Sequence, residues 1–451
     1  MNKHTDIPFK EFPASGLAAF DSLRAEDEPW LEHCFVPPPE FDLIAGARSV
    51  VVFGESGSGK TALYQAMRRR LAPAGVRPMR LSFEWHPLAG VPSEVEVDRL
   101  LSAGALELLS YLAHWPATFG QAPDHNRMTL TWFIQKHLSG SLQYTVDEVG
   151  KQADETGQAL LRDLVSSTVP DKYLDGASPE QIIAELTKSL PRVGLTDVCV
   201  LVDLDAPGDM ESVGNSLTDF LSTLRLFENP RVIYKLILPT ELEPTLARAG
   251  GVIRRRLGRY WLRWLEHNLM AIVERRLWLS SEGKIEQLKE VCEDKELLVW
   301  LARCGGASPR GWLDHIQLLA AHYLDLGRPV TAGEWRQIRR MRPPEFWVDE
   351  EQRRVVVGHR QIQDIPEIEW AILRYLYQHR ERICSREELY HKAHLPVSGA
   401  SQADQHFFPK EYEGALNNAL MRLRQAIEPA PNAPLFIVTH KGKGVKLERT
   451  W

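Results

Sequence analysis

Residues 49–61 read Ser-Val-Val-Val-Phe-Gly-Glu-Ser-Gly-Ser-Gly-Lys-Thr, and the helix-forming stretch Ala-Leu-Tyr-Gln-Ala-Met-Arg follows them directly. The apolar run predicts a short strand, and the eight residues after it fit the pattern G-x-x-x-x-G-K-[ST] between a strand and a helix. In such a loop, glycines let backbone N–H groups converge on phosphate oxygens at the positive end of the helix. The stretch therefore predicts a phosphate-binding loop in an α/β fold, and the match at every position favours it over a plain Gly/Ser-rich turn.

The residues of this loop have separable tasks in nucleotide binding. Lys60 can reach the β- and γ-phosphates, and the Thr61 hydroxyl can ligate Mg²⁺. ATP and Mg²⁺ are therefore the predicted cofactors. The residues expected to bind the nucleotide are Gly54, Ser56, Gly57, Ser58, Gly59, Lys60 and Thr61.

A second strand-like run ends in carboxylates. Residues 198–202 are all apolar, which is typical of a strand buried on both faces, and Asp203, Leu204 and Asp205 follow. Asp203 would lie at the carboxyl end of the strand, where open α/β sheets place their ligands, and we expect it to hold Mg²⁺ rather than only to cap the strand. Many ATPases place a glutamate immediately after this aspartate to polarise the attacking water. Leu204 occupies that position, so Asp205 is the candidate substitute, and ATP hydrolysis to ADP and phosphate is left open.

The segment between the two nucleotide motifs is long. About 140 residues separate Thr61 from Asp203, which is more than one crossover needs. Residues 79–85 predict a further strand, and the rest predicts a helical insertion at about 94–190. Its Trp and Leu stripes are expected to be packing surface, with a protein partner as the alternative. The helical segments are 94–115, 129–140, 155–169 and 178–190.

From residue 259 the pattern is continuously helical. The composition and order of residues 40–340 resemble the core and lid of P-loop ATPases of the AAA+ and STAND kinds, especially archaeal initiators. The resemblance implies that Arg310, in the stretch Gly-Gly-Ala-Ser-Pro-Arg, senses the γ-phosphate; the alternative is an arginine in the first turn of a surface helix. It also implies a γ-phosphate sensor after the strand predicted at 232–238, for which Thr240 is the candidate, with a helix N-cap as the alternative.

Six arginines with no acid between them lie across the boundary between the core and the lid. Three interpretations stay open: a solvated helix face, a contact with nucleic-acid phosphates, or an arginine finger directed at a neighbouring subunit. The third would apply to a homo-oligomer assembled in the ATP state, with Arg254, Arg255 or Arg256 as the finger. The six residues are Arg248, Arg254, Arg255, Arg256, Arg259 and Arg263.

A different domain begins after Met-Arg-Pro-Pro at 341–344. Short strands are predicted first, then three helices and a final hairpin. The order resembles the winged helix-turn-helix of OmpR/PhoB-type regulators, in which double-stranded DNA is the partner. The resemblance rests on Ser-Arg-Glu-Glu-Leu at 385–389, Arg-Leu-Arg at 422–424 and Ile-Val-Thr-His-Lys-Gly-Lys-Gly at 437–444, and the loop at 396–413 is longer than is usual in the family.

In this domain the third helix would lie in the major groove, while the hairpin, or wing, would hold backbone phosphates. Amides suit adenine, and arginine suits guanine or phosphate. Residues 415–451 carry six basic and two acidic residues, although the whole chain has a net charge of −6. The alternative is that the domain is a protein-interaction module. In either case the residues of the third helix expected to face the core are Leu416, Leu420, Leu423 and Ile427. The predicted DNA contacts are Asn417, Asn418, Met421, Arg422, Arg424 and Gln425 on the helix and Lys441, Lys443 and Lys446 on the wing.

The composition fits a cytoplasmic, multidomain protein. The chain has 451 residues, of which 44% are hydrophobic, and five scattered cysteines without a CxxC pair. No apolar run approaches the roughly 20 residues that span a bilayer, so no membrane partner is expected. The predicted fold is an α/β P-loop NTPase core with a helical insertion and a helical lid, followed by a C-terminal winged-helix domain. The predicted division is an N-terminal extension at 1–40, the core at 41–258, the lid at 259–342 and the winged helix at 345–451.

Together these patterns favour an ATP-binding, slowly hydrolysing switch that couples nucleotide state to DNA binding through its winged helix. Two alternatives stay open. One is a STAND-type signalling or defence ATPase, whose winged helix contacts protein and which oligomerises with ATP. The other is an initiator- or loader-like DNA ATPase, against which Leu204 argues mildly.

Overall fold

The chain forms two compact units in the computed structural model. One is Pro37–Arg263, and the other joins Met1–Val36 to Trp264–Trp451. Asp205, Arg254 and all but one residue of the 396–411 stretch lie outside the described residues. The structure describes residues 20, 25–28, 30–73, 75–88, 90–170, 173–174, 176–204, 210–223, 229–248, 255–394, 397 and 412–448.

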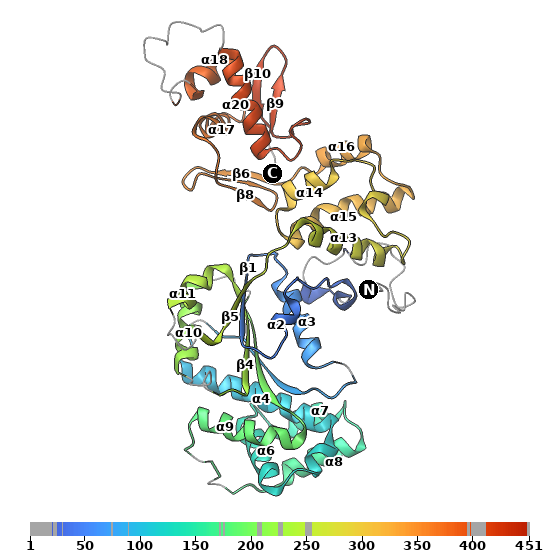
Figure 1. Ribbon diagram of the computed structural model, residues 1–451, viewed down its shortest axis with the longest axis vertical. Coiled ribbons are helices and arrows are strands. Elements are labelled where there is room, and N and C mark those ends of the chain that lie inside the picture. Colours follow the sequence, from blue (N-terminus) through green and yellow to red (C-terminus); the bar gives the residue numbers. More distant parts are fainter. Residues whose placement is uncertain are drawn as a thin grey trace. The chain divides into compact units, whose positions relative to one another are not determined.

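A five-stranded sheet is the centre of the Pro37–Arg263 unit (Figure 1). Its order is β2-β3-β4-β1-β5 and every neighbouring pair is parallel, so all the carboxyl ends meet at one edge. The strands predicted around 50, 80, 200 and 235 are confirmed. The strands are β1 (Val50–Gly54), β2 (Arg80–Trp85), β3 (Asp197–Asp203), β4 (Val232–Pro239) and β5 (Gly258–Trp261).

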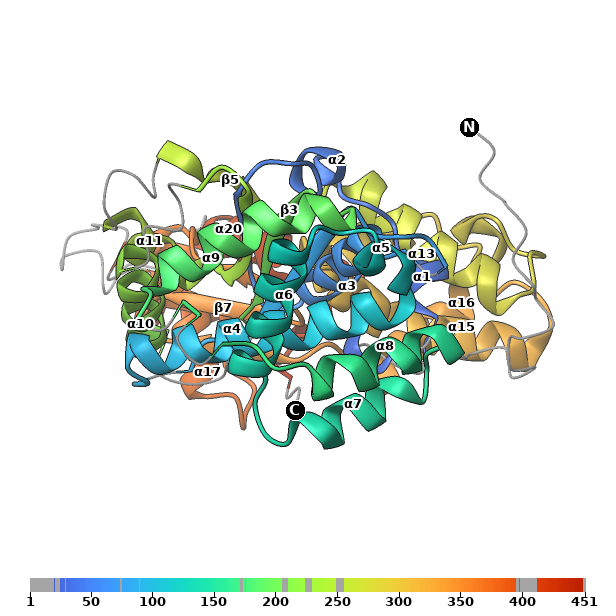
Figure 2. The same cartoon turned by 90° about the horizontal axis from the view of Figure 1, so that it is seen from below.

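The helical insertion packs on one face of this sheet through its first helix, the other helices pack around that one, and in Figure 2 these helices lie in front. Gly104 brings the first helix against β2 so closely that a Cβ there would lie 2.2 Å from the Phe83 ring. The leucine stripes are buried, with Leu100, Leu108 and Leu112 each 0% exposed, so the packing interpretation is confirmed. The helices are α4 (Ser93–His114), α5 (Pro116–Gly120), α6 (Asp124–His137), α7 (Leu142–Gly150), α8 (Glu155–Ser166), α9 (Pro179–Ser189) and η4 (Leu190–Val193).

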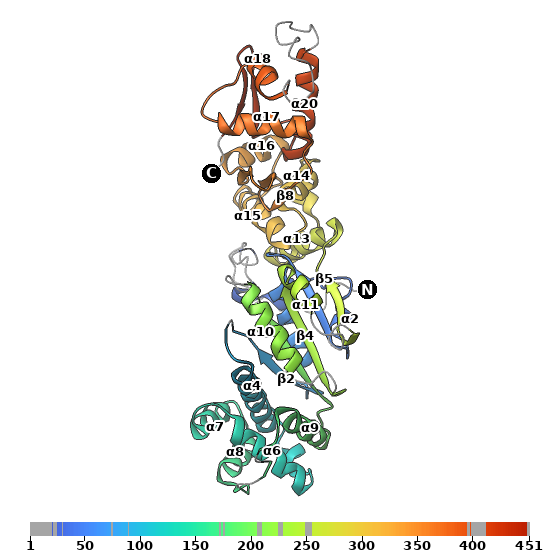
Figure 3. The same cartoon turned by 90° about the vertical axis from the view of Figure 1, so that its left-hand side faces the viewer.

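The described part of this unit contains further helices. The P-loop helix α3 (Lys60–Leu71) covers the opposite face of the sheet from α4. Helix α10 (Met210–Thr223) packs against both α4 and α11 (Glu243–Arg248), as Figure 3 shows. A short α2 (Phe41–Ile44) precedes β1, and the single turn η6 (Thr240–Leu242) follows β4.

The prediction that the chain is helical from residue 259 was wrong. Residues Gly258–Trp261 form β5, which pairs with β1 from Val50↔Gly258 onward, and the Leu262 N–H donates to the Phe53 carbonyl at 2.7 Å. Aromatic residues favour strands, and β1 would otherwise present an open edge here. The core therefore continues to Arg263, and Arg259 lies on a strand, so the six arginines do not share one helix face.

The second unit begins with a helical part, and described residues from the N-terminal segment pack against it. Glu28 and Arg276 form a buried ion pair at 2.7 Å, and Arg275 Nε donates to the His33 carbonyl at 2.7 Å. The described residues between 20 and 36, predicted as part of a separate extension at 1–40, therefore belong to this unit. Its elements are η3 (Ala25–Asp27), α1 (Leu31–Cys34), α13 (Glu266–Ser280), η7 (Leu288–Glu290), α14 (Leu297–Gly305), α15 (Pro309–Leu326) and α16 (Ala332–Met341).

The C-terminal part is a winged helix, as predicted. A three-stranded antiparallel sheet precedes the helices, and α17 packs against α20 (Figure 3). The four residues of α20 predicted to face the core are 0–2% exposed. The elements are β6 (Phe346–Asp349), β7 (Arg354–Val357), β8 (Arg360–Ile362), α17 (Glu367–Gln378), α18 (Arg386–Leu389) with the π-helical turn η8 (Tyr390–His394), α20 (Tyr412–Ile427), β9 (Ile437–His440) and β10 (Gly444–Leu447).

Direct contacts join the helical part to the winged helix within this unit. The His359 N–H donates to the Cys304 carbonyl at 2.7 Å, and Arg303 Nη1 donates to the Glu428 carbonyl at 3.0 Å. In the described part of the chain, no helix is long and apolar enough to cross a bilayer.

Candidate functional site

The P-loop has the backbone that its glycines were expected to permit. Gly57 and Gly59 have φ angles of 76° and 91°, a left-handed conformation that side chains with a Cβ rarely adopt. Gly54 is required for a different reason, since a Cβ there would lie 2.4 Å from Ser58 Oγ. The loop thus closes tightly and leads its N–H groups into the first turn of α3, which begins at Lys60.

Lys60 is held within the P-loop. Its side chain is buried, and Nζ donates to the Glu55 carbonyl at 3.1 Å, across the loop. Ser58 is buried, Thr61 is half-buried in the first turn of α3, and Ser56 is exposed. Converging N–H groups, a helix N-terminus and a lysine ammonium are the donor set that a polyphosphate requires, so the loop fits the phosphates of ATP.

Asp203 lies at the same edge of the sheet as the P-loop. It is the last residue of β3 and pairs with Ile237 of β4, while Gly54 at the end of β1 pairs with Pro239. One strand therefore separates the carboxylate from the loop. The described part of the chain has no group of three or more His, Cys, Asp or Glu residues suited to a metal. A hydroxyl and one carboxylate fit Mg²⁺, which usually takes its remaining ligands from phosphate and water.

The residue after Asp203 cannot activate water. Leu204 is 5% exposed, and its N–H donates to the Ile237 carbonyl at 3.0 Å. A carboxylate that the sequence analysis did not single out lies on the neighbouring strand. Glu84 of β2 is paired in register with Leu201 and is on the same face of the sheet as Asp203, opposite the buried Phe83. The same argument from strand ends that identified Asp203 could have identified Glu84, since it is the penultimate residue of β2.

The surroundings of Glu84 show how it is held. Arg68 of α3 forms an ion pair with its carboxylate. The Tyr64 hydroxyl is buried and forms no hydrogen bond with a described residue; burial, followed by the charge of Glu84 and with a smaller effect of Asp203, raises the pKa of Tyr64 well above its ordinary value. Tyr64 therefore stays protonated and can donate toward these carboxylates. Burial and the charge of Glu84 also raise the pKa of Glu107 on α4.

The two predicted γ-phosphate sensors are placed differently. Thr240 begins η6 directly after Pro239, whose partner in the sheet is Gly54. The N-cap of η6 is Pro239, so the alternative of Thr240 as an N-cap is not observed. Arg310 lies in the first turn of α15, in the other unit. Its role as a sensor stays a prediction.

The exposed face of α20 is polar. Five of the six α20 residues predicted to contact DNA are exposed, among them the apolar Met421 at 52%, and the sixth, Arg424, is half-buried. Arg386 of α18 donates to Asn417 Oδ1 at 2.8 Å, which adds a cation that the sequence analysis did not assign to this surface. The remaining exposed members are Asn418, Arg422 and Gln425.

Several predicted cations are already engaged within the winged helix. Arg424 donates to the Ile437 carbonyl at 3.0 Å and to Thr439 Oγ1 at 2.6 Å, so it holds the wing against α20. Arg422 pairs with the buried Glu369 at 2.6 Å, and Lys446 pairs with Glu448 at 3.1 Å. Lys441 and Lys443 are exposed on the wing turn and form no ion pair with any described residue.

The fold and the loop define a P-loop α/β protein with a C-terminal winged helix. No family profile matches the chain, and no curated protein matches it significantly. Among solved structures, the chain is similar to the Aeropyrum pernix ORC1 protein in complex with DNA, with 15% identity and a TM-score of 0.31 over 93% of each chain. At that score the similarity assigns no role to any residue.

Proposed function

We propose that the chain is an ATP-binding switch whose nucleotide state controls DNA binding by its winged helix. The P-loop is the observation that carries the proposal. Gly57 and Gly59 in left-handed conformation, the close contact at Gly54 and the buried Lys60 suit phosphates and have no evident use without them. The winged helix in the same chain would supply the second activity, DNA binding.

Each residue of the nucleotide site has a definite task in this proposal. The loop N–H groups and Lys60 bind the β- and γ-phosphates, while Thr61 and Asp203 hold Mg²⁺. Mg²⁺, when bound, would neutralise part of the negative charge of the phosphates. Thr240, directly after the strand that pairs with β1, would distinguish ATP from ADP. A ligand shifts such an equilibrium by binding one state better than the other, and the γ-phosphate provides that difference.

Glu84 is the residue we propose to orient the attacking water. Replacing it by glutamine removes the proton acceptor and keeps the shape, so ATP turnover should fall by about 100-fold, the usual contribution of a general base. The affinity for Mg-ATP should change little. Single-turnover phosphate release measures the first quantity and equilibrium titration the second.

The control for Glu84→Gln is Arg68→Ala. That change removes the ion pair and keeps the carboxylate, so turnover should fall much less. Equal losses in the two variants would mean that the ion pair is structural and that Glu84 has no part in the chemistry.

The wing lysines should contribute to DNA affinity through phosphate charge. Replacing both Lys441 and Lys443 by alanine should weaken binding to all duplex sequences alike and lower the slope of log affinity against log salt by about 2. Lys446→Ala is the matched control, because Glu448 already neutralises Lys446 and its loss should cost less. Fluorescence anisotropy with a labelled duplex over a salt series measures both. A wild-type chain that binds no duplex at low salt would contradict the proposal.

The decisive experiment compares three nucleotide states. Particle size and DNA mobility shift are measured for the chain without nucleotide, with ADP and with a non-hydrolysable ATP analogue. A DNA shift that depends on the nucleotide supports the switch. ATP-dependent assembly without any DNA shift would favour the STAND-type alternative, and rapid DNA-stimulated hydrolysis would favour the initiator- or loader-like one.

A further inference from the structure

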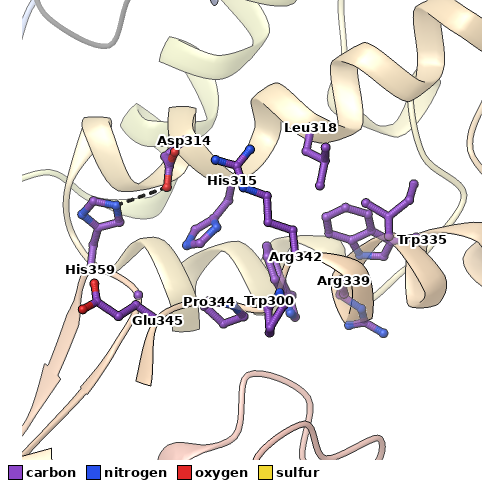
Figure 4. Close-up of a pocket in the computed structure, with 13 residues that line it drawn as sticks. Trp300, Asp314, His315, Leu318, Trp335, Arg339, Arg342, Pro344, Glu345 and His359 are labelled. Atoms are coloured by element: carbon purple, nitrogen blue, oxygen red, sulfur yellow. Dashed lines mark ion pairs between the residues drawn. The ribbon is translucent and has the colours of Figure 1, made fainter. Parts of the chain in front are cut away.

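A cavity of about 290 Å³ lies in the second unit, far along the chain from the P-loop residues. Its walls come from α14, α15 and α16 on one side and from the turn between β7 and β8 on the other (Figure 4). Gly358 in that turn has a φ of 58°, and a Cβ there would lie 2.6 Å from the Cys304 carbonyl and 3.0 Å from His315 Nε2. The turn therefore closes tightly on the helices and leaves the cavity between the two parts of the unit.

Three buried N–H donors on the wall of this cavity have no acceptor. They are Trp300 Nε1, Trp335 Nε1 and Arg339 Nη1, and none forms a hydrogen bond with any described residue. The three residues are 3%, 1% and 5% exposed. Asp294 and Glu296 act on Arg339 by their charge, but neither is hydrogen-bonded to it.

Buried donors without acceptors are rare, because each one loses its hydrogen bonds to water and gains none in return. Three of them around one cavity, contributed by two helices, therefore point to an acceptor that the chain itself does not supply. Arg339 and Arg342 add positive charge at the cavity, and Arg342 extends toward Asp314 in Figure 4. The lining also carries two carboxylates, Asp314 and Glu345, and Arg342 extends toward the first, so the three N–H donors and the charge of Arg339 are what select an anionic group.

The remaining polar groups limit what else the occupant can be. Asp314 is engaged by His359, whose Nε2 lies 3.6 Å from Asp314 Oδ2. His315 Nε2 is buried without a hydrogen-bond partner among the described residues, and burial lowers the pKa of His315 to about 4. The ring is therefore neutral at pH 7 and can either donate or accept one hydrogen bond. The indole rings of Trp300 and Trp335, with centroids 5.0 Å apart, form an apolar wall.

We propose that this cavity binds a small molecule bearing a carboxylate or phosphate group. The anionic group accepts hydrogen bonds from Trp300, Trp335 and Arg339, and a polar substituent meets His315. The cavity is at the small end of the range for ligand sites, which suits a molecule of a few heavy atoms to about a dozen. Because its walls belong to both the helical part and the winged helix, the occupant touches both. The lining of the cavity includes no residue of the nucleotide site.

The test uses the full chain with Lys60→Ala, so that the P-loop does not take up the probe. Inorganic phosphate and citrate are titrated separately, which distinguishes a phosphate ligand from a carboxylate ligand. Binding is followed by calorimetry and by the indole N–H resonances of the 13 tryptophans in a ¹H–¹⁵N spectrum. Two resonances, identified by their loss in Trp300→Phe and Trp335→Phe, should shift when the probe binds.

Variants decide whether binding occurs at this cavity. Arg339→Met should weaken binding by about tenfold or more, as expected for a lost charged hydrogen bond. Arg340→Met is the matched control, because Arg340 is the exposed neighbour on the same helix, and it should bind as before. Failure of both probes to shift either resonance would overturn the proposal and leave the cavity to water. Equal binding by Arg339→Met and Arg340→Met would overturn it as well.

Discussion

Lys60→Ala should weaken Mg-ATP binding by about 1000-fold, or roughly 4 kcal/mol, which is the usual cost of removing one partner from a buried, hydrogen-bonded charge pair. Lys60 is 4% exposed and already points across the loop, with Nζ 3.1 Å from the Glu55 carbonyl. No other described cation is placed in the loop to replace it. Calorimetric titration with Mg-ATP measures the loss, and DNA binding in the presence of ATP should then match that of the nucleotide-free chain.

Two further variants make this prediction specific. Lys188→Ala removes an exposed lysine of the same unit and should bind ATP normally. Gly54→Ala puts a Cβ 2.4 Å from Ser58 Oγ and 3.0 Å from Lys60 Cγ, so these side chains must shift within the loop and affinity should fall. If Lys60→Ala changed neither the nucleotide affinity nor the nucleotide dependence of DNA binding or assembly, the proposed switch would be wrong.

The fold could be predicted from the sequence where the signals were local. The strand ending at Gly54 and the helix beginning at Lys60 follow from contiguous residues, and so do the core positions of α20. The strand β5 was missed because its aromatic residues, Tyr260 and Trp261, continue into the apolar pattern of the next helix. Its identity as a strand depends on pairing with β1, about 200 residues earlier, which no local pattern encodes.

The same contrast between local and long-range interactions explains which site residues could be predicted. The P-loop is one run of eight residues, so all of its members were predicted together. Glu84, Arg68 and Tyr64 come from two separate elements and meet only when α3 packs on β2 and β3. The engagement of Arg424 by the wing also depends on tertiary packing. A motif can assign a residue to a helix, but its partners are set by the fold.

Lys235→Met should destabilise the chain by about 4 kcal/mol. The buried ammonium donates three hydrogen bonds, each with a net contribution of about 1.5–3 kcal/mol, and the cost of burying the charge offsets part of their sum. Lys235, on β4, is 0% exposed. Its Nζ donates to the Ile44 carbonyl, and also to the carbonyls of Gly46 and Arg48 at 2.8 Å each. These bonds fix the segment that leads into β1, so Lys235→Met should loosen the strand that precedes the P-loop. Urea denaturation of the full chain measures the change.

The pH dependence of stability gives a second readout for Lys235. Burial, the largest cause, lowers its pKa from 10.5 to about 8, so between these values the unfolded chain binds more protons than the folded chain. The contribution of Lys235 to stability therefore rises as pH increases from about 8 to 10.5, and the gap between wild type and Lys235→Met should widen over that window. Lys188→Met, at an exposed position in the same unit, should show neither the loss nor the widening gap. A gap that narrows as pH rises would mean that the three carbonyls outweigh burial and keep Lys235 charged.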